Sequence, residues 1–294
     1  MNIQFTFFGS SRFSVIVLDE LTKHGFIPAK IVTTPDKPQG RRLTMTPNVV
    51  KAWAMKHSIG AITPEKLDSS FIEELKVEQK DIKNAPQVFI VASYGKIIPA
   101  AVIDIPPRKT LNIHPSLLPQ YRGASPLPTA ILNDTKHTGI TIMRINEKMD
   151  EGPIVAQKEI SIESIFPEWP TYEVFEEYMA REGARLLASV LPDWIGEKIE
   201  EKEQDHLQAS YTKKIKKEDG LIDLTADSYA NFRKIQAYHE WPQAYFFIGS
   251  GDTQIRVKIT SVSFRDGILI IEKVIPENSR EMSYKDFASG YSDS

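Results

Sequence analysis

The feature that most constrains the fold is the alternation of short apolar strands with amphipathic helices along the first third of the chain. Strand patterns lie at residues 3–8, 29–33, 61–63 and 87–92. Helix patterns lie between them, at 13–24, at 49–57 behind the cap Asn48, and after a capping box formed by Ser70 and Glu73. Strands that alternate with helices pair in parallel and are covered on both faces. We therefore expect an α/β fold with a Rossmann-like, doubly wound and mostly parallel sheet.

The turn after the first strand reads GSSRFS, which differs from the G-x-G-x-x-G turn that binds dinucleotides. No acidic residue is placed to hold a ribose. The sequence therefore disfavours a nicotinamide-dependent dehydrogenase, although sheet topology alone would suggest one.

The segment NIHPSLLPQYRGASP begins at Asn112 and includes the end of a further predicted strand, KTLNIHP. Strand side chains alternate between faces, so Asn112 and His114 share one face while their apolar neighbours share the other. Pro115 ends the strand and leaves His114 at the rim, where open α/β sheets bind ligands. Taken alone, the pair is also compatible with turn or surface residues.

A third segment, residues 138–160, has the pattern of two strands joined by a polar turn. The turn carries Asp150 and Gly152 and so places a carboxylate on a tight loop. With this segment the chain resembles the folate-dependent formyltransferases, whose members carry N-x-H-P-S-L-L-P, then R-G-A-x-P, then T-G-I/V-T and an Asp before a Gly. All of these pieces are present here in that order.

Further segments resemble the methionyl-tRNA formyltransferases in particular, and the resemblance covers nearly the whole chain. These segments are FFGSSRFS, TTPDKPQGRRLTMTP, ASYGKIIP and AYHEWPQA. The PDKPQGR loop and the later W-P pair are the most particular to the enzymes that act on tRNA.

The resemblance implies formyl transfer from 10-formyltetrahydrofolate to an amine, a reaction that passes through a tetrahedral oxyanion. Asn112 is then the oxyanion donor, His114 the proton carrier, and Asp150 the group that orients the imidazole. An α-amino group has a pKa near ~8 and a histidine about 6.5, so an imidazole can take the amine's proton at neutral pH.

The resemblance also implies which residues surround the folate. They are Ser116, Leu117, Leu118 and Pro119 in one loop, Ser93, Tyr94 and Gly95 in a second, and Glu151 and Gly152 beside Asp150. From the sequence alone, plain loop packing explains Leu117 and Leu118 equally well.

A basic loop containing Lys37, Arg41 and Arg42 is stiffened by prolines. Long ordered loops beside a catalytic strand are usually functional, whereas a solvated surface loop is the alternative from the residues alone. The resemblance implies that this loop contacts the acceptor stem of initiator methionyl-tRNA.

The chain is expected to divide into a catalytic domain, a linker and a C-terminal domain, at residues 1–195, 196–208 and 209–294. The linker GEKIEEKEQDHLQ is charged and lacks apolar periodicity, and it follows a helix predicted at 171–191 that Pro192 begins to end. In the last part, Asp227 caps a helix that stops before Trp241, and strands follow around GSGDT and RDG.

This C-terminal part is expected to be a small, OB-like β-barrel, as the resemblance implies. The strand that ends at Phe264 turns at once through RDG into ILIIEKVI, where the family has about two further strands of ordinary length. We therefore expect a shortened domain.

Composition limits which folds, chemistries and locations are possible for this chain. The 294 residues are 41% hydrophobic, enough for one ordinary core and a smaller second core. Cysteine is absent, which excludes disulfides, thiolate metal sites and cysteine nucleophiles and fits a reducing compartment. The net charge of −3 argues against a general nucleic-acid coat protein. Without a targeting sequence or an apolar run of about 20 residues, we expect a cytoplasmic monomer with no metal and no membrane contact.

Together, the motifs and the resemblance predict an enzyme that formylates the methionyl α-amino group of initiator methionyl-tRNA for translation initiation. A nucleotide-sugar N-formyltransferase would share the three catalytic residues but would not need the basic loop. A hydrolase that passes the formyl group to water is a further alternative. A catalytically silent RNA-binding protein is disfavoured, because the catalytic set is intact.

Overall fold

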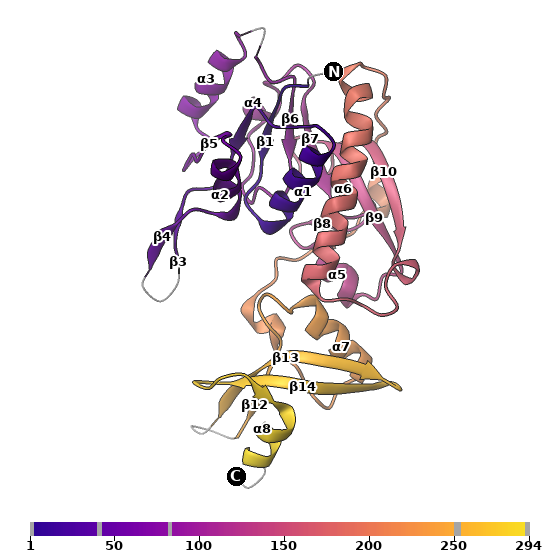
Figure 1. Ribbon diagram of the computed structural model, residues 1–294. Coiled ribbons are helices and arrows are strands. Elements are labelled where there is room, and N and C mark those ends of the chain that lie inside the picture. The colour runs from indigo at the N-terminus through magenta and orange to yellow at the C-terminus, as the bar shows by residue number, and fades with distance from the viewer. Residues whose placement is uncertain (1–2, 40–42, 82–83, 250–253, 292–294) are drawn as a thin grey trace. The chain divides into compact units, whose positions relative to one another are not determined.

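The central element of the protein is a seven-stranded sheet with the strand order β10-β9-β7-β6-β1-β2-β5 (Figure 1). The computed structural model describes residues 3–39, 43–81, 84–249 and 254–291. The strands of this sheet are β1 (Phe5–Phe8), β2 (Lys30–Val32), β5 (Gly60–Ile62), β6 (Val88–Val91), β7 (Thr110–His114), β9 (His137–Arg144) and β10 (Ile154–Ser161). Neighbours among β5, β2, β1, β6 and β7 are parallel, and β9 is antiparallel to β7. The expected Rossmann-like sheet is confirmed.

The helices and the remaining short strands fill the connections. The helices are α1 (Arg12–Lys23), α2 (Val49–Lys56), α3 (Ser69–Glu78), α4 (Ala100–Ile103), α5 (Pro126–Leu132), α6 (Tyr172–Ile195), α7 (Ser228–Ala237) and α8 (Tyr284–Tyr291). Two short pairs are β3 (Lys37–Gln39) with β4 (Thr44–Thr46), and β8 (Arg122–Gly123) with β11 (Tyr211–Thr212). Single 3₁₀ turns lie at Ile162–Ser164, His206–Gln208 and Lys217–Gly220.

Side-chain caps fix where the helices begin. The caps predicted at Asn48 for α2 and Asp227 for α7 are present, each accepting backbone N–H groups of the first turn. In α3 the cap is Asp68, whose carboxylate accepts a first-turn N–H at 3.3 Å. The predicted capping box of Ser70 and Glu73 is therefore wrong, because Ser70 already lies inside the helix.

The long helix α6 continues past Pro192, where the sequence predicted that its end would begin. Proline removes a helical hydrogen bond, but the turn that follows it is anchored by burial. Trp194 and Ile195 are both buried, and the Trp194 indole N–H donates to the Arg108 carbonyl oxygen at 2.9 Å. Packing of these two side chains outweighs the local cost of the proline.

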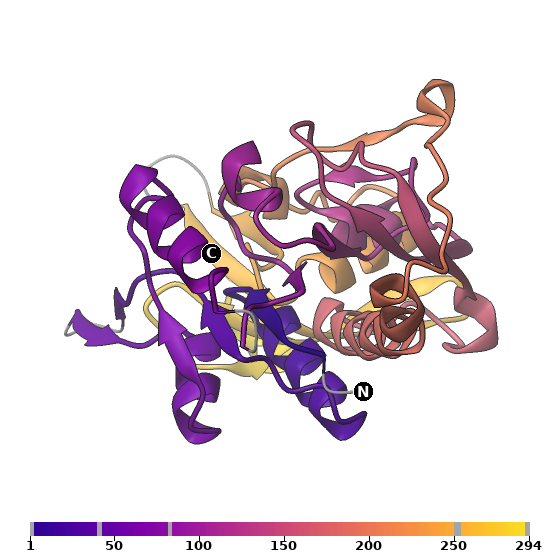
Figure 2. The same cartoon turned by 90° about the horizontal axis from the view of Figure 1, so that it is seen from above.

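The two faces of β7 are in different environments. A Cβ atom at Gly183 of α6 would lie 2.6 Å from the Ile113 side chain, so the α6 backbone packs directly on that face. Helix α1 lies beside α6, because buried Glu20 of α1 is paired with Arg181 at 3.1 Å and with Arg185 at 2.8 Å (Figure 2). Burial acts to raise the pKa of Glu20, but its hydrogen bonds to Lys23 and Arg185 bring it below the ordinary value.

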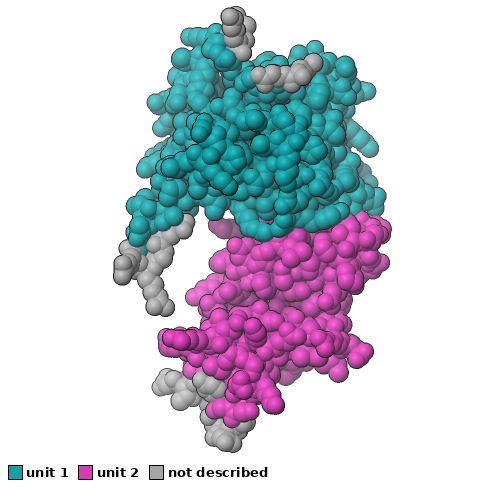
Figure 3. Space-filling model, in the orientation of Figure 1, with its two compact units in different colours: residues 1–122, 139–160, 177–211 teal, residues 123–138, 161–176, 212–294 magenta. Residues whose placement is uncertain are grey.

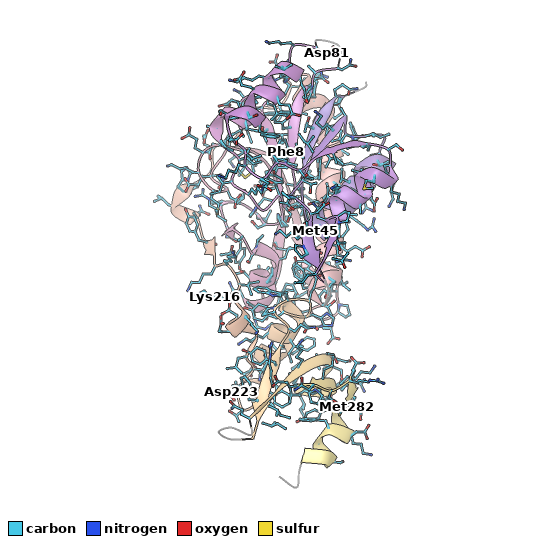
Figure 4. All side chains as sticks on the ribbon, turned by 90° about the vertical axis from the view of Figure 1, so that its left-hand side faces the viewer. Phe8, Met45, Asp81, Lys216, Asp223 and Met282 are labelled. Atoms are coloured by element: carbon cyan, nitrogen blue, oxygen red, sulfur yellow. The ribbon has the colours of Figure 1, made fainter. Side chains whose placement is uncertain are left out.

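The opposite face of the sheet forms a second core with α3 and α4. Its buried residues are Phe8, Val32, Phe71, Leu75, Phe89, Val91, Tyr94 and Val102. Figure 4 labels Phe8 within this sheet. The polar side chains of β7 share this face, since Asn112 is the neighbour of Val91 across the parallel ladder.

The described chain forms two compact units built from interleaved segments. Unit 1 contains residues 1–122, 139–160 and 177–211, and unit 2 contains residues 123–138, 161–176 and 212–294 (Figure 3). This division differs from the predicted division into three consecutive parts, because residues 123–138 and 161–176 pack with α7 in unit 2. For example, the Asp134 carboxylate accepts from Trp169 Nε1 at 2.7 Å and from the Tyr229 hydroxyl at 3.0 Å. The boundaries 1–195, 196–208 and 209–294 stay a prediction.

Unit 2 contains a four-stranded antiparallel sheet in the order β12-β13-β14-β15, formed by Tyr245–Ile248, Ile255–Arg265, Ile268–Pro276 and Met282–Ser283. The predicted turn after Phe264 is present, with left-handed φ of +52° at Asp266 and +77° at Gly267. Helices α7 and α8 contribute Ile235 and Phe287 to its core. The described strands are ordered as an open sheet. Helix α8 was not predicted from the sequence.

Candidate active site

The candidate site lies at the carboxyl edge of the parallel strands, where β1, β6 and β7 end. On either side of β1 the chain order runs in opposite directions, and such a switch point is where open α/β sheets bind ligands. The loop after β1 is tied to the loop after β6: Ser10 N–H donates to the Ser93 carbonyl at 3.1 Å, and the Ser10 hydroxyl donates to the Tyr94 carbonyl at 2.7 Å. These two loops form one wall of the edge.

Asn112 and His114 lie on the same face of β7, about 6.6 Å apart along the strand. His114 is buried, and Asn112 is half-buried. Among the described residues, no hydrogen-bond partner is recorded for the Asn112 carboxamide. Its N–H groups are therefore available to a ligand at this edge, and the role of Asn112 as an oxyanion donor stays a prediction.

His114 has a defined orientation. Its Nε2 lies 3.0 Å from the carbonyl oxygen of Tyr121, which can only accept, so we assign the proton of the neutral ring to Nε2. Nδ1 then carries the lone pair, and it faces Asp150 Oδ1 at 3.8 Å. Protonation of Nδ1 turns this contact into an ion pair. The structure thus brings His114 and Asp150 together.

Asp150 lies in the turn between β9 and β10 and has a left-handed backbone, with φ of +53°. Few residues other than glycine adopt this conformation, and Asp is among those that tolerate it best. The side chain of Asp150 is 17% exposed, so it is partly shielded from solvent beside the buried imidazole.

The loop from Ser116 to Pro119 is held by its own hydrogen bonds. The Ser116 hydroxyl donates to the Gln120 carbonyl at 2.6 Å, and the Leu118 N–H donates to Thr141 Oγ1 at 3.1 Å. A Cβ atom at Gly139 would lie 2.5 Å from the Leu117 side chain, so Leu117 packs directly on β9. This loop is fixed beside His114, and contact of its residues with folate stays a prediction.

The second predicted folate loop has left-handed φ values of +52° at Ser93 and +78° at Gly95. Between them, Tyr94 is buried and packs edge-on against Phe8, with ring centroids 5.6 Å apart. Burial raises the pKa of the Tyr94 hydroxyl to about 12, so this phenol stays neutral. Tyr94 is a core residue of this wall, and Ser93 is exposed.

Glu151 and Gly152 follow Asp150 and are tightly packed. The side chain of Glu151 is 21% exposed and lies 3.5 Å from Arg122 Nη1. A Cβ atom at Gly152 would lie 1.8 Å from the Arg144 carbonyl oxygen, so only glycine fits there.

Of the predicted RNA-binding residues, the described part of the chain contains Lys37, which begins strand β3 of the β3–β4 hairpin. This hairpin projects from unit 1, and Figure 4 labels Met45 on it (Figures 1 and 4). Lys37 is exposed at its base, whereas Arg41 and Arg42 lie outside the described residues. The hairpin is anchored by an ion pair between Asp36 and Lys51 at 2.7 Å.

Sequence reasoning missed two residues that hold the site together, Arg122 and Gln204. Arg122 is 1% exposed and donates to Gln204 Oε1, and Gln204 in turn donates to the Asp150 carbonyl oxygen at 2.9 Å. The signal for Arg122 was its place in the R-G motif after the catalytic strand. Gln204 gave no signal, because it lies in a charged segment interpreted as a linker.

In the described part of the chain, no group of three or more His, Cys, Asp or Glu side chains is arranged to hold a metal ion. No helix within the described ranges is both long and apolar enough to cross a bilayer.

Comparison with known proteins shows the family of this chain. Residues 1–197 match the model of the formyl transferase family, and residues 214–264 match that of the formyl transferase C-terminal domain. The methionyl-tRNA formyltransferase of Chloroflexus aggregans is 43% identical over 242 residues, which cover 82% of this chain and 75% of that protein. That of Thermus thermophilus is 34% identical over 306 residues, covering 97% of this chain and 95% of the relative.

Solved structures share the fold at lower identity. A methionyl-tRNA formyltransferase from Clostridium thermocellum has a TM-score of 0.59 at 16% identity and covers 96% of this chain and 99% of its own. A sugar N-formyltransferase from a Shewanella species has a TM-score of 0.60 at 18% identity, with 92% and 96% covered. HypX from Aquifex aeolicus, solved with tetrahydrofolic acid, has a TM-score of 0.66 at 14% identity, with 98% of this chain and 47% of HypX covered. On the family models and the curated relatives, the chain belongs to the formyl transferase family.

Proposed function

We propose that this protein transfers the formyl group of 10-formyltetrahydrofolate to the methionyl α-amino group of initiator methionyl-tRNA, a step of translation initiation. The observation that carries the proposal is the arrangement of Asn112, His114 and Asp150 at the carboxyl edge of the sheet, with the 3.8 Å contact between His114 Nδ1 and Asp150 Oδ1. The names of the relatives at 34–43% identity support the choice of acceptor.

In this mechanism the reacting amine must lose a proton before it attacks the formyl carbon, since an ammonium group has no lone pair. His114 Nδ1 receives that proton, because Nε2 already donates to the Tyr121 carbonyl. The imidazolium then pairs with Asp150, which does not itself need to carry the proton.

The attack forms a C–N bond and places negative charge on the formyl oxygen. The Asn112 carboxamide donates a hydrogen bond to this oxygen, and the imidazolium of His114 adds a second favourable charge. The attacking nitrogen then loses its second proton to solvent, the C–N bond to the folate breaks, and the proton held at Nδ1 passes to the departing nitrogen. The acceptor gains a formyl group, and tetrahydrofolate leaves with one proton.

Folate is proposed to bind between the two loops at the strand ends, Ser93–Gly95 and Ser116–Pro119, with Glu151 and Gly152 beside it. Their fixed backbone supports this, because the left-handed residues and internal hydrogen bonds give a preorganised wall. The tetrahydrofolic acid in the HypX structure supports the same class of co-substrate. We propose no metal, a cytoplasmic location and a monomeric state.

The β3–β4 hairpin is proposed to contact the acceptor stem through Lys37, Arg41 and Arg42. Exposure of Lys37 and the ion pair that anchors the base of the hairpin support this role, since an exposed cation can neutralise a phosphate and an anchored base loses little entropy on binding. A nucleotide-sugar acceptor would not need such a projection.

A single assay distinguishes the acceptors. Purified protein is given 10-formyltetrahydrofolate labelled in the formyl group together with charged initiator methionyl-tRNA, with a nucleotide-linked amino sugar, or with water alone. Label is expected on the tRNA only. Label on the sugar, or free formate at the same rate in all three reactions, would replace the proposal by one of the alternatives.

The catalytic roles are tested by substitution. Asn112→Ala and His114→Ala should each lower kcat by roughly 10²–10³-fold, with a small effect on folate affinity. The double variant should lose far less than the product of the single losses, because the residues act on one transition state. His57→Ala, at the end of α2, is the matched control and should retain full activity. Full activity in either site variant would remove that residue from the mechanism.

A further inference from the structure

The candidate site is supported by a buried arginine that is not part of the proposed chemistry. The guanidinium of Arg122 is 1% exposed, and its Nε and Nη2 donate to Gln204 Oε1 at 3.1 and 2.7 Å. Nη1 donates to the Tyr211 hydroxyl at 3.1 Å and lies 3.5 Å from the Glu151 carboxylate, while Nη2 lies 2.9 Å from His206 Nδ1. A guanidinium stays charged in proteins, so its burial is costly and requires such a set of partners.

This contact fixes the orientation of the Gln204 carboxamide. Arginine offers only donors, so the atom facing Arg122 must be the carboxamide oxygen. The NH₂ group of Gln204 then points the other way and donates to the carbonyl oxygens of Asp150 at 2.9 Å and Gly152 at 2.7 Å. Because the carboxamide is polarised by a charged donor, these two bonds are stronger than ordinary ones.

The clamped segment is the one that carries the catalytic carboxylate. Asp150 has a left-handed φ of +53°, so the direction of its side chain depends on how the peptide groups on both sides are held. The two bonds from Gln204 hold the carbonyl of Asp150 itself and that of Gly152, two residues later. A small rotation there would change the 3.8 Å separation from His114.

The same arginine also stands next to the group that orients His114. Tyr121 accepts the Nε2 proton of His114 through its carbonyl oxygen, which belongs to the peptide bond leading into Arg122. The N–H groups of Tyr121 and Arg122 both donate to Ser210, at 2.9 Å each. One buried residue therefore links the support of the imidazole to the support of the carboxylate.

We propose that Arg122 and Gln204 are positioning residues, which set the separation and direction of His114 and Asp150 without touching the reacting atoms. The proposal rests on the catalytic roles proposed above for that pair. Gln204 acts through the backbone of Asp150, and Arg122 acts through Gln204 and through the peptide it shares with Tyr121. Misplacement of a catalytic group by about 1 Å costs on the order of 10²-fold in rate.

The main test is Gln204→Glu, which keeps the size of the side chain and its acceptor for Arg122. The carboxylate cannot donate to the carbonyls of Asp150 and Gly152. The expected result is a fall of kcat by roughly 10²-fold with the KM for each substrate nearly unchanged. A variant with unchanged kcat would overturn the proposal.

The matched control is Gln79→Glu. Gln79 also donates its NH₂ group to two backbone carbonyl oxygens of unit 1, those of Pro86 at 2.9 Å and Ile105 at 3.4 Å. These carbonyls lie far in sequence from Asp150, just before β6 and just after α4. This variant loses the same two donors, so it should lower the melting temperature while kcat per folded molecule stays at the wild-type value.

A double-mutant cycle separates positioning from general support of the fold. If Gln204 acts through Asp150, Gln204→Glu should cost little more once Asp150→Ala has removed the carboxylate. Full additivity of the two losses would mean that Gln204 acts elsewhere and would overturn the proposal. Inactive wild-type protein would instead point to a failure of the proposed reaction.

A milder variant covers the case in which Gln204→Glu does not fold. His206 is half exposed, with 56% of its side chain accessible, and is a partner of Arg122 that the fold can lose. His206→Ala should lower kcat by less than Gln204→Glu does, with KM unchanged. If His206→Ala retains the wild-type kcat while Gln204→Glu fails to fold, the network supports the fold only, and the positioning role is refuted.

Discussion

Substitution of Gly152 by alanine gives a sharp test of how the loop that carries Asp150, the proposed catalytic carboxylate, is packed. The added Cβ would lie 1.8 Å from the Arg144 carbonyl oxygen and 3.1 Å from Met143 Cε, whereas ordinary contacts begin near 3.4 Å. The φ angle of Gly152 is outside the left-handed region, so the obstacle is steric and not conformational. Either the loop or the end of β9 must move by more than about 1 Å, because the 1.8 Å separation is far shorter than an ordinary contact.

The end of β9 is the less mobile of the two. Arg144 is in register with Leu111 of β7, and its N–H donates to the Pro153 carbonyl at 2.9 Å. Its side chain is paired with Glu201 at 2.7 Å. The loop that carries Asp150 is therefore expected to shift, and the two bonds from Gln204 to it should weaken.

Overpacking of this kind typically costs about 1–3 kcal/mol, which lowers the melting temperature of a domain of this size by roughly 2–12 °C. Displacement of Asp150 by about 1 Å should lower kcat by roughly 10²-fold. Thermal unfolding and steady-state kinetics measure the two effects. Gly60→Ala is the control in the same unit, because nothing lies within 4 Å of its added Cβ. If Gly152→Ala matches this control in both measurements, the packing argument is wrong.

Two further predictions concern the hairpin and unit 2. Replacing Lys37, Arg41 and Arg42 together by Ala should raise the KM for tRNA and reduce the salt dependence of binding by about two to three phosphate contacts, with folate binding unchanged; equal salt slopes would exclude the loop. In unit 2, His239 Nδ1 lies 2.8 Å from Glu173. This hydrogen bond raises the pKa of His239 above its ordinary value of 6.5. Burial acts to raise the pKa of Glu173, but the bond to His239 brings that pKa below its ordinary value of 4.5. The pair should therefore stabilise the protein fully between about pH 4.5 and 6.5, and this stability should be lost at higher pH as His239 loses its proton and at lower pH as Glu173 gains one. In melting temperatures measured against pH, His239→Gln should remove the decrease at higher pH.

The parts of the site that lie in regular strands were predictable from the sequence, because strand periodicity determines which side chains share a face. Asn112 and His114 follow from two-residue alternation and from the proline that ends β7. The position of Asp150 relative to His114 could not follow from periodicity, since it depends on a left-handed turn and on antiparallel pairing of β9 with β7. Family motifs supplied that link.

Two local predictions failed because a stronger signal, either another cap or burial, decided where the helix begins or ends. Ser70 and Glu73 have the spacing of a capping box, but Asp68 stands two residues earlier and begins the helix first. Pro192 is a helix breaker, but the two buried residues after it extend α6. The first error comes from a competing local cap, and the second comes from tertiary contacts that a local pattern does not contain.

The segment interpreted as a linker shows the same limit with a consequence for function. Residues 201–208 of this segment lack apolar periodicity because their contacts are polar and not because they are free. Glu201 pairs with Arg144, Lys202 pairs with Ile154 through the backbone, and Gln204 is held by Arg122. A charged sequence that forms hydrogen bonds to a site looks, in composition, like a solvated connection. Truncation of the chain within this segment would remove the support of the Asp150 loop together with residues 212–294 of unit 2, so the two contributions to activity can be separated only by single substitutions.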